Sequence, residues 1–296
     1  MSDTFSAYHP IVNFVYFLFV LGFSMSLMHP VCLLISFVCA FIYSVYLEGK
    51  KALKFNAFFM LPTLITTALI NPAFNHSGAT ILAYLYNGNP LTLESIIYGI
   101  AAALMLVTVV SWFSCFNAVM HSDKFVYLFG RLIPALSLIL SMSLRFVPRF
   151  KAQIKVISNA QKCIGRDVSN GSVLQRAKHG VRILSIMVTW VLESAVETAD
   201  SMKGRGYGLP GRTAFSLFRF DSRDRRALMY LIVCGGYVII GVITNGIYFR
   251  YFPTIKGVFI TPYSMTVFLA YSALCIMPVV LNIREDLKWK AMKSGI

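Results

Sequence analysis

Two short sequences centred on arginine have the residue types needed to bind an acidic surface. They are Gly165-Arg166-Asp167 and Gly204-Arg205-Gly206, 39 residues apart, and each follows a helical pattern. Because glycine accepts the left-handed backbone that often ends a helix, we expect the helices to end at Gly165 and Gly204. Arginine pairs with carboxylates in a bidentate way that lysine cannot reproduce. In the alternative, each arginine only complements the negative end of its own helix, which is worth about 0.3–1 kcal/mol.

The two helices that lead to these sequences carry rows of opposite charge. The rows are Lys151, Lys155 and Lys162 on the first helix and Glu193, Glu197 and Asp200 on the second. The acidic residues are spaced i, i+4, i+7, which places them on one side of a helix. We predict that some of the charges pair, Lys155 with Glu197 for example. A solvated acidic face, or a proton relay if the row lay within the membrane core, is the alternative.

The sequence predicts no catalytic, cofactor-binding or metal-binding residues. It lacks the GxxxxGK[ST], HExxH and GxSxG motifs, and "GRGYG" at 204–208 follows a helix and misses the GxGxxG spacing. The five histidines show no metal-ligand spacing, and we expect them to be solvated or interfacial. The six cysteines form no CxxC pair, which is typical of free thiols.

The composition is that of an integral membrane protein. Hydrophobic residues make up 57% of the chain, against about 45–50% in soluble proteins, and the mean hydropathy is +0.68. The formal net charge is +15, and 16 of the 27 Lys and Arg residues lie between 145 and 226. Basic segments beside membrane spans follow the positive-inside rule and face anionic lipid. The bilayer, rather than nucleic acid, therefore accounts for the charge.

Apolar runs predict six membrane crossings with both termini in the cytoplasm. The runs cover residues 11–28, 31–47, 55–70, 94–116, 227–248 and 258–281. The turn at His29 and the loop 71–93 contain no Lys or Arg, whereas the segment after residue 47 is basic, which sets the orientation. We expect the third crossing to be distorted at Pro62, and residues 79–86 to form a short strand or a re-entrant piece.

We divide the chain into N-terminal transmembrane helices at 1–116, a cytoplasmic segment at 117–226, and C-terminal transmembrane helices with a basic tail at 227–296. Within the cytoplasmic segment, residues 132–147 predict an interfacial helix. Residues 148–165 predict an amphipathic one. Residues 173–203 fit a single helix of about 46 Å. Its predicted apolar side contains Leu184, Val188, Val191, Ala195 and Met202.

Three stretches resemble a known family. They are "IPALSLILSMSLRFVPRF" at 133–150, "AQKCIGRD" at 160–167 and "ETADSMKGRGYGLPGRT" at 197–213. They are similar to the transmembrane T component of energy-coupling-factor (ECF) transporters, in the CbiQ-like family of cobalt-transport permeases. The resemblance implies an all-α membrane protein with a crossed pair of cytoplasmic coupling helices. It also implies that Arg166 and Arg205 dock into ATP-binding-cassette subunits. The family motif often reads Ala-Arg-Gly, from which the first site departs at both flanking positions.

By the same resemblance, the chain is a scaffold rather than an enzyme. ATP would be bound and hydrolysed by two partner ATPase subunits. A small membrane protein, the S component, would bind the vitamin or transition metal ion that is taken up. The expected location is a bacterial or archaeal cell membrane. The alternative function is a self-sufficient permease with its own substrate site, although the apolar spans carry few ionisable groups, mainly Glu94.

Overall fold

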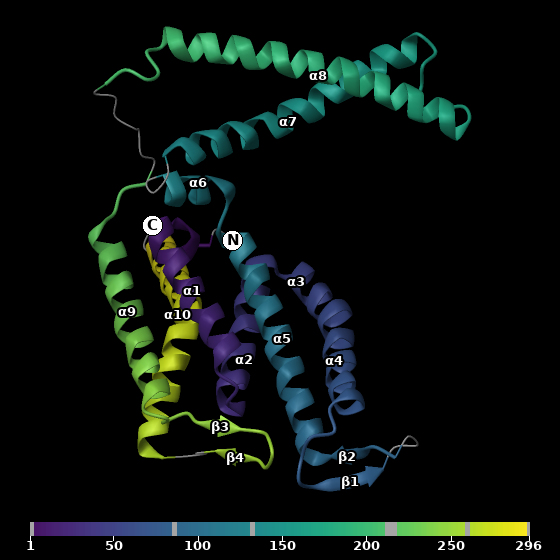
Figure 1. Ribbon diagram of the computed structural model, residues 1–296. Coiled ribbons are helices and arrows are strands. Elements are labelled where there is room, and N and C mark those ends of the chain that lie inside the picture. The colour runs from purple at the N-terminus through teal and green to yellow at the C-terminus, as the bar shows by residue number, and fades with distance from the viewer. Residues whose placement is uncertain (1–2, 85–87, 131–133, 211–217, 258–260, 295–296) are drawn as a thin grey trace. The chain divides into compact units, whose positions relative to one another are not determined.

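The structure is a computed structural model that describes residues 3–84, 88–130, 134–210, 218–257 and 261–294 (Figure 1). It divides into two compact units, which we treat separately: Met1–Lys124 with Phe218–Ile296, and Phe125–Leu217. Helices dominate both units, as predicted. The helices of the first unit are α1 (Pro10–Ser26), α2 (Pro30–Glu48), α3 (Lys50–Phe55), α4 (Leu61–Phe74), α5 (Leu93–Val119), α9 (Ser222–Ile243) and α10 (Pro262–Ser294). Helix α6 (Ser122–Gly130) begins at the end of this unit, and α7 (Pro134–Cys163) and α8 (Val173–Gly204) form the second.

Six helical segments are long and apolar enough to cross a membrane by length and composition. They are Pro30–Glu48, Ala52–Phe74, Leu93–Val119, Val173–Gly204, Ser222–Ile243 and Pro262–Lys293. Five of them match predicted crossings. The first predicted crossing corresponds to α1, an apolar helix of 17 residues. The sixth candidate is α8, which the sequence analysis assigns to the cytoplasmic segment.

Histidine and proline start the first two helices in the same way. The ring nitrogens of His9 and His29 accept hydrogen bonds from the amides of Ile11 (3.3 Å) and Val31 (3.2 Å). The proline that follows each histidine is well suited to the first helical position. Both histidines are buried, so the part of the prediction that makes them solvated is wrong. Each ring caps its helix through Nδ1. The described residues contain no metal-binding cluster of His, Cys, Asp or Glu.

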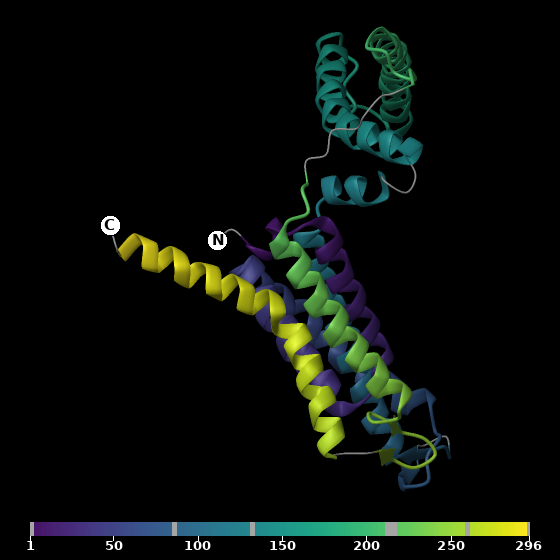
Figure 2. The ribbon, with the colours of Figure 1, turned by 90° about the vertical axis from the view of Figure 1, so that its left-hand side faces the viewer.

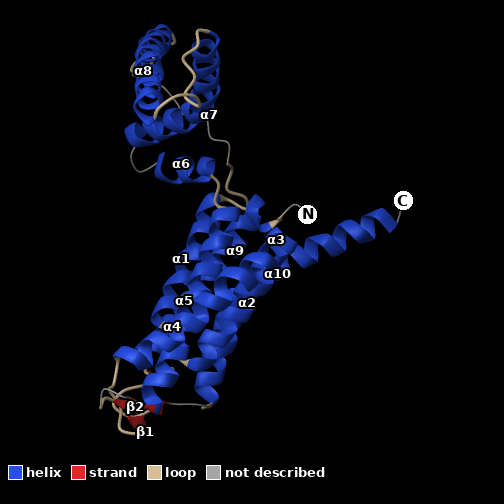
Figure 3. Cartoon of the chain, turned by 90° about the vertical axis from the view of Figure 1, so that its right-hand side faces the viewer, coloured by secondary structure: helices blue, strands red, loops and turns tan. Residues whose placement is uncertain are grey.

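The predicted irregularities of the third crossing and of the loop after it are confirmed. A π-helical turn at Asn56–Met60 precedes Pro62. Proline cannot donate to the carbonyl four residues earlier, which disturbs the helix at that point. Strand β1 (Ile81–Tyr84) pairs antiparallel with β2 (Pro90–Thr92), so the predicted strand is present. A second short hairpin joins β3 (Phe249–Arg250) to β4 (Lys256–Gly257). Figure 3 shows β1 and β2 at the end of the first unit opposite its termini.

Large aromatic side chains fill the core of the first unit. Trp112, Tyr16 and Tyr43 are fully buried where α5, α1 and α2 pack together. The Trp112 indole donates to the Ser36 hydroxyl at 2.9 Å, and Ser36 shares a hydrogen bond of 2.7 Å with Ser24. Buried polar groups are costly unless they are hydrogen-bonded, so these contacts allow polar side chains inside an apolar bundle.

The N-terminal segment is attached to the point where α5 ends. Lys124 Nζ donates to the Ser6 carbonyl (2.6 Å), the Ser6 hydroxyl (3.1 Å) and the Val119 carbonyl (2.9 Å). The adjacent Phe5 is buried and its amide donates to Asn282 of α10. The buried Lys124 ammonium therefore joins the N-terminal segment, through Ser6, to the C-terminal end of α5 at Val119.

The second unit contains two long helices joined by a short turn. Helix α8 spans the predicted residues. Helix α7 runs without a break through Pro148, so the predicted change from an interfacial helix to a separate amphipathic one at this residue is wrong. Residues on both sides of the proline are helical. Residues 132 and 133 of the predicted interfacial helix lie outside the described part of the chain.

Candidate docking site on the crossed helices

A small apolar cluster holds α7 and α8 together where they cross (Figure 1). Ile157 of α7 and Ile183 and Met187 of α8 are 7%, 9% and 7% exposed. Phe150 and Trp190 make an edge-to-face contact beside them, with ring centroids 6.0 Å apart. Such aromatic pairs add about 0.5–1.5 kcal/mol beyond the area they bury. The contact fixes the crossing point and leaves the four helix ends outside the cluster.

Helix α7 ends in a Schellman motif at Gly165, as predicted. Gly165 has φ +72°, and its amide donates to the Lys162 carbonyl at 3.0 Å. The Arg166 amide donates to the Gln161 carbonyl at 3.0 Å. Arg166 is therefore the residue just after the left-handed glycine. Its backbone is fixed by the motif while its side chain stays exposed.

Helix α8 ends with the same motif at a different glycine. The left-handed residue is Gly206 (φ +75°), whose amide donates to the Lys203 carbonyl at 2.9 Å. The Tyr207 amide completes the motif by donating to the Met202 carbonyl at 3.0 Å. Gly204 is the last helical residue and Arg205 is the C-cap, with φ −85°. The expectation that Gly204 takes the left-handed conformation is therefore wrong.

The two arginines consequently occupy different places in otherwise similar helix ends. Superposing the motifs by their left-handed glycines pairs Gly165 with Gly206, and Arg166 with Tyr207 rather than with Arg205. Arg205 stands two positions earlier, at the cap of its helix. The repeat of Gly followed by Arg in the sequence is thus not a structural repeat. Each end presents its arginine from its own backbone position.

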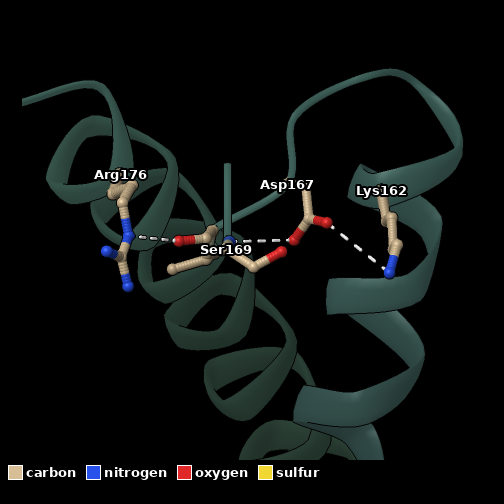
Figure 4. Close-up of polar contacts among 5 residues, drawn as sticks. Lys162, Asp167, Ser169 and Arg176 are labelled. Carbon is tan, nitrogen blue, oxygen red and sulfur yellow. Dashed lines mark hydrogen bonds and ion pairs between the residues drawn. The ribbon is translucent and has the colours of Figure 1, made fainter. Parts of the chain in front are cut away.

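Asp167 stabilises the turn between the helices (Figure 4). Its carboxylate accepts a hydrogen bond from the Ser169 amide at 3.0 Å and forms an ion pair with Lys162 at 3.5 Å. Hydrogen bonding by Ser169 lowers the pKa of Asp167, and the Lys162 ammonium lowers it further. Arg176 Nε closes the other side by donating to the Val168 carbonyl at 2.8 Å. Both carboxylate oxygens of Asp167 therefore have partners within the chain.

A cationic hollow of about 560 Å³ lies beside Arg166. Arg166, Lys178 and Arg182 contribute its charges, and no carboxylate of the described residues lines it. The Gln161 side-chain oxygen, which also lines the hollow, is buried without a hydrogen-bond partner among the described residues. The hollow can therefore hold acidic groups of a partner. The Gln161 oxygen can also accept a hydrogen bond from a donor on that partner. The sequence analysis missed Lys178 and Arg182, although their i, i+4 spacing puts them on one side of α8 near the turn.

The two charged rows do not pair with each other. Within the described ranges, the ion pairs within 4.0 Å are Lys162–Asp167 and Lys288–Glu285. The predicted contact of Lys155 with Glu197 is not formed. The crossing packs Ile157 against Ile183 and Met187, which lie one to three turns before the acidic row. Lys151, Lys155, Glu193, Glu197 and Asp200 are all exposed, so the solvated alternative describes the rows better.

Most of the predicted apolar side of α8 faces away from α7. Val191 packs against the crossing cluster, but Leu184 and Val188 are 65% and 51% exposed. Exposed Leu192 extends this strip by one turn, and exposed Val181 extends it by one turn in the other direction, where it also lines the cationic hollow. We call these four residues the apolar strip of α8. Helix α8 thus has one side that packs against α7, one acidic side, and one apolar side that is exposed among the described residues of its unit.

Comparisons with known proteins agree with the resemblance. A family model described as "Cobalt transport protein" (CbiQ) matches residues 9–215. Similar proteins are named "Energy-coupling factor transporter transmembrane protein EcfT". The one from Lactobacillus helveticus is 33% identical over 109 residues, covering 36% of this chain and 39% of the relative. The one from Bacillus subtilis is 34% identical over 99 residues, covering 33% and 37%. The matched part spans about two fifths of these relatives.

Proposed function

The chain belongs to the CbiQ family of cobalt transport proteins, and from this premise we propose that it is the energy-coupling membrane subunit of an ECF-type importer. In this role the first unit lies in the membrane and the crossed helices lie on the cytoplasmic side. Two ATPase subunits bind to the ends of the crossed helices and bind and hydrolyse the ATP. Their movement is passed on to a separate membrane subunit that binds the substrate.

The observation that carries the proposal is the exposed arginine at each helix end. Arg166 and Arg205 are exposed, and neither forms an ion pair within 4.0 Å in the described part of the chain. At the α7 end, the hollow of Arg166, Lys178 and Arg182 suits a cluster of partner carboxylates. A chain whose sequence lacks a phosphate loop needs ATPase partners to use ATP.

The two ends suit two contacts of different character. Arg166 acts with two neighbouring cations, so other charges partly compensate for its loss. Arg205 is at the C-cap beside Gly206, with one other cation, Lys203, in the last turn, and with exposed Tyr207 and Leu209 after it. We therefore expect the Arg205 contact to depend more strongly on its one guanidinium.

The apolar strip of α8 fits the substrate-binding subunit. Leu184, Val188 and their neighbours lie exposed on a helix whose other sides face α7 or carry charge. Exposed apolar surfaces of this kind mark interaction sites. A small membrane protein offers an apolar surface, whereas a soluble ATPase offers a polar one. The S component is thus the partner whose chemistry matches the strip.

Substrate choice lies with that partner in this proposal, and a vitamin or a transition metal ion is the expected class. The alternative, a self-sufficient permease, predicts uptake by the purified chain in vesicles without other subunits. The coupling proposal predicts no uptake under those conditions. It predicts uptake when both ATPases and the S component are added.

The test is copurification of the ATPases with the Arg166→Ala/Arg205→Ala variant. Truncating an arginine whose partner carboxylate is buried costs about 2–5 kcal/mol at each site. The variant should insert normally and retain the S component, yet lose the ATPases and all uptake. Arg145→Ala is the matched control, because Arg145 is exposed on α7 away from both ends. Normal ATPase recovery and uptake with the double variant would reject the docking assignment.

A further inference from the structure

A groove in the first unit has features of a ligand site that coupling does not use. It has a volume of about 610 Å³ and lies between α9, α10 and Tyr8. Small-molecule sites in proteins commonly have about 300–1,000 Å³. The groove is formed entirely by residues of one unit, and both helices are candidate membrane spans.

One end of the groove is strongly cationic. Its charged lining residues are Arg223, Arg226, Arg284, Lys288 and Glu285. Lys288 and Glu285 pair at 3.4 Å. Arg223 is held in place by the Tyr8 ring at 4.2 Å and by the Ala7 carbonyl, to which it donates at 3.3 Å. Arg226 and Arg284 form no ion pair within the described ranges, so two guanidinium groups from neighbouring helices are available for an anion.

The rest of the groove is apolar. Ala227 of α9 and Met277 of α10 are buried at its floor, and Ile276 and Val280 are 39% and 41% exposed along it. Helix α10 contains Pro278, and Figure 2 shows its C-terminal part bending away from the rest of the bundle. A proline within a helix is a common cause of such a bend. The bend puts the basic residues at one end of a groove that continues between two membrane spans.

We propose that this groove binds an anionic phospholipid. Arg226 and Arg284 bind the headgroup phosphate, and an acyl chain lies over Ile276, Met277 and Val280. Basic pockets between spans on the cytoplasmic side favour such headgroups. A zwitterionic lipid brings its own cation toward the arginines, which disfavours it. A free phosphate ion would satisfy the arginines but would leave the apolar floor uncovered.

Native mass spectrometry of the purified full-length chain tests the headgroup contact. Phosphatidylglycerol and phosphatidylcholine are added separately in detergent. The wild-type chain should retain phosphatidylglycerol at least about tenfold more strongly, which corresponds to about 1.4 kcal/mol. Arg226→Gln/Arg284→Gln should abolish this preference. Arg225→Gln/Lys290→Gln is the matched control, since these residues belong to the same helices and do not line the groove. Equal retention of both lipids by wild type, or an unchanged preference in the Arg226/Arg284 variant, would overturn the proposal.

A second variant separates a lipid from a soluble anion. Ile276→Gln/Val280→Gln makes the floor polar without touching the arginines, and partly exposed positions should tolerate it. We expect this variant to lose phosphatidylglycerol. Glycerol 3-phosphate, which has the phosphate but no acyl chain, should compete with the lipid only weakly. If glycerol 3-phosphate displaced the lipid at equal concentration, or if the polar floor retained it fully, the groove would be an anion site and not a lipid site.

Discussion

The two units of the molecule differ in how completely they satisfy their own side chains. In the first, Trp112 is fully buried and its indole is bonded to Ser36 at 2.9 Å. In the second, three side chains at 7–9% exposure form the centre of the only described apolar cluster between α7 and α8. Large apolar side chains such as Leu184 and Val188 lie outside it, more than half exposed.

In the proposed function, this difference separates a unit that packs within the chain from one that binds partners. The first unit presents apolar residues to lipid, and polar side chains in its core such as Ser24, Ser36 and Trp112 are hydrogen-bonded to one another, as a membrane solvent requires. The second exposes an apolar strip, a cationic hollow and an acidic row on the same two helices. Substitutions in the two units should therefore change the free energy of unfolding by different amounts, and substitutions in the second unit should also change partner binding.

The largest effect on stability is expected for Trp112→Ala in the first unit. It removes a fully buried aromatic side chain and leaves a cavity between α1, α2 and α5. Such substitutions cost about 3–5 kcal/mol. Thermal unfolding of the purified chain should show a marked fall in midpoint. Trp289→Ala, at a side chain that is 61% exposed, is the control and should change stability by less than about 0.5 kcal/mol. Similar midpoints for the two variants would contradict the burial of Trp112.

A smaller effect is expected for Met187→Ala at the crossing. Met→Ala changes in cores cost about 2–5 kcal/mol, and we expect about 2 because this cluster is small and open on its sides. Limited proteolysis should show faster cleavage within residues 125–217 while the first unit stays resistant. Leu184→Ala, one turn away on the exposed strip, should leave the cleavage rate unchanged. Equal acceleration by both variants would mean that α7 packs against a different side of α8.

Little change in stability is expected when the apolar strip is made polar. Leu184→Ser/Val188→Ser removes exposed side chains, so the isolated chain should lose less than about 1 kcal/mol. The complex should respond more strongly, because the S component would lose an apolar contact. Recovery of the S component on the purified chain measures this. Thr189→Ser, at an exposed residue of the same helix outside the strip, serves as the control. If the variant recovered as much S component as wild type, the strip would not be the binding surface for this partner.

A pH-dependent change in stability is expected at Lys124. Burial lowers the pKa of Lys124 from 10.5 to about 8, with Asp3 opposing the shift. Between these values the unfolded chain holds a proton that the folded chain has released, so the free energy of unfolding should rise with pH across this window. The slope of the unfolding midpoint between about pH 8 and about pH 10 should be lower in Lys124→Met than in wild type. Lys290→Met should keep the wild-type slope, and a Lys124→Met slope that matched it would show that Lys124 titrates normally.

The sequence predicted most of the fold because apolar runs and helix-ending glycines act locally. The short strand within 79–86, the distortion at Pro62 and the helix end at Gly165 were all predicted from nearby residues. The features that the sequence analysis missed depend on tertiary packing. His9 and His29 are buried as helix caps, and α7 continues through Pro148. Residue spacing alone does not state which helix covers a side chain.

The candidate site shows the same limit more sharply. The sequence singled out Arg166 and Arg205 but treated them as equivalent, since each follows a glycine. The left-handed residue proved to be Gly206, which moves Arg205 to the C-cap. The charged rows have the right signs to pair, yet the crossing point at Ile157, Ile183 and Met187 keeps them apart. Lys178 and Arg182 become part of the candidate site only because the turn between α7 and α8 brings them beside Arg166.

Titration of the purified ATPase pair against the purified chain tests the central claim most directly. We compare wild type with Arg205→Ala, Arg205→Lys and Arg166→Ala. A docking arginine predicts that Arg205→Ala raises Kd about 30-fold or more, that Arg205→Lys restores little of the loss, and that Arg166→Ala has a smaller effect because Lys178 and Arg182 remain. An arginine that only caps its helix predicts a loss of less than about 1 kcal/mol and full rescue by lysine. A Kd for Arg205→Ala within about fivefold of wild type would contradict the account.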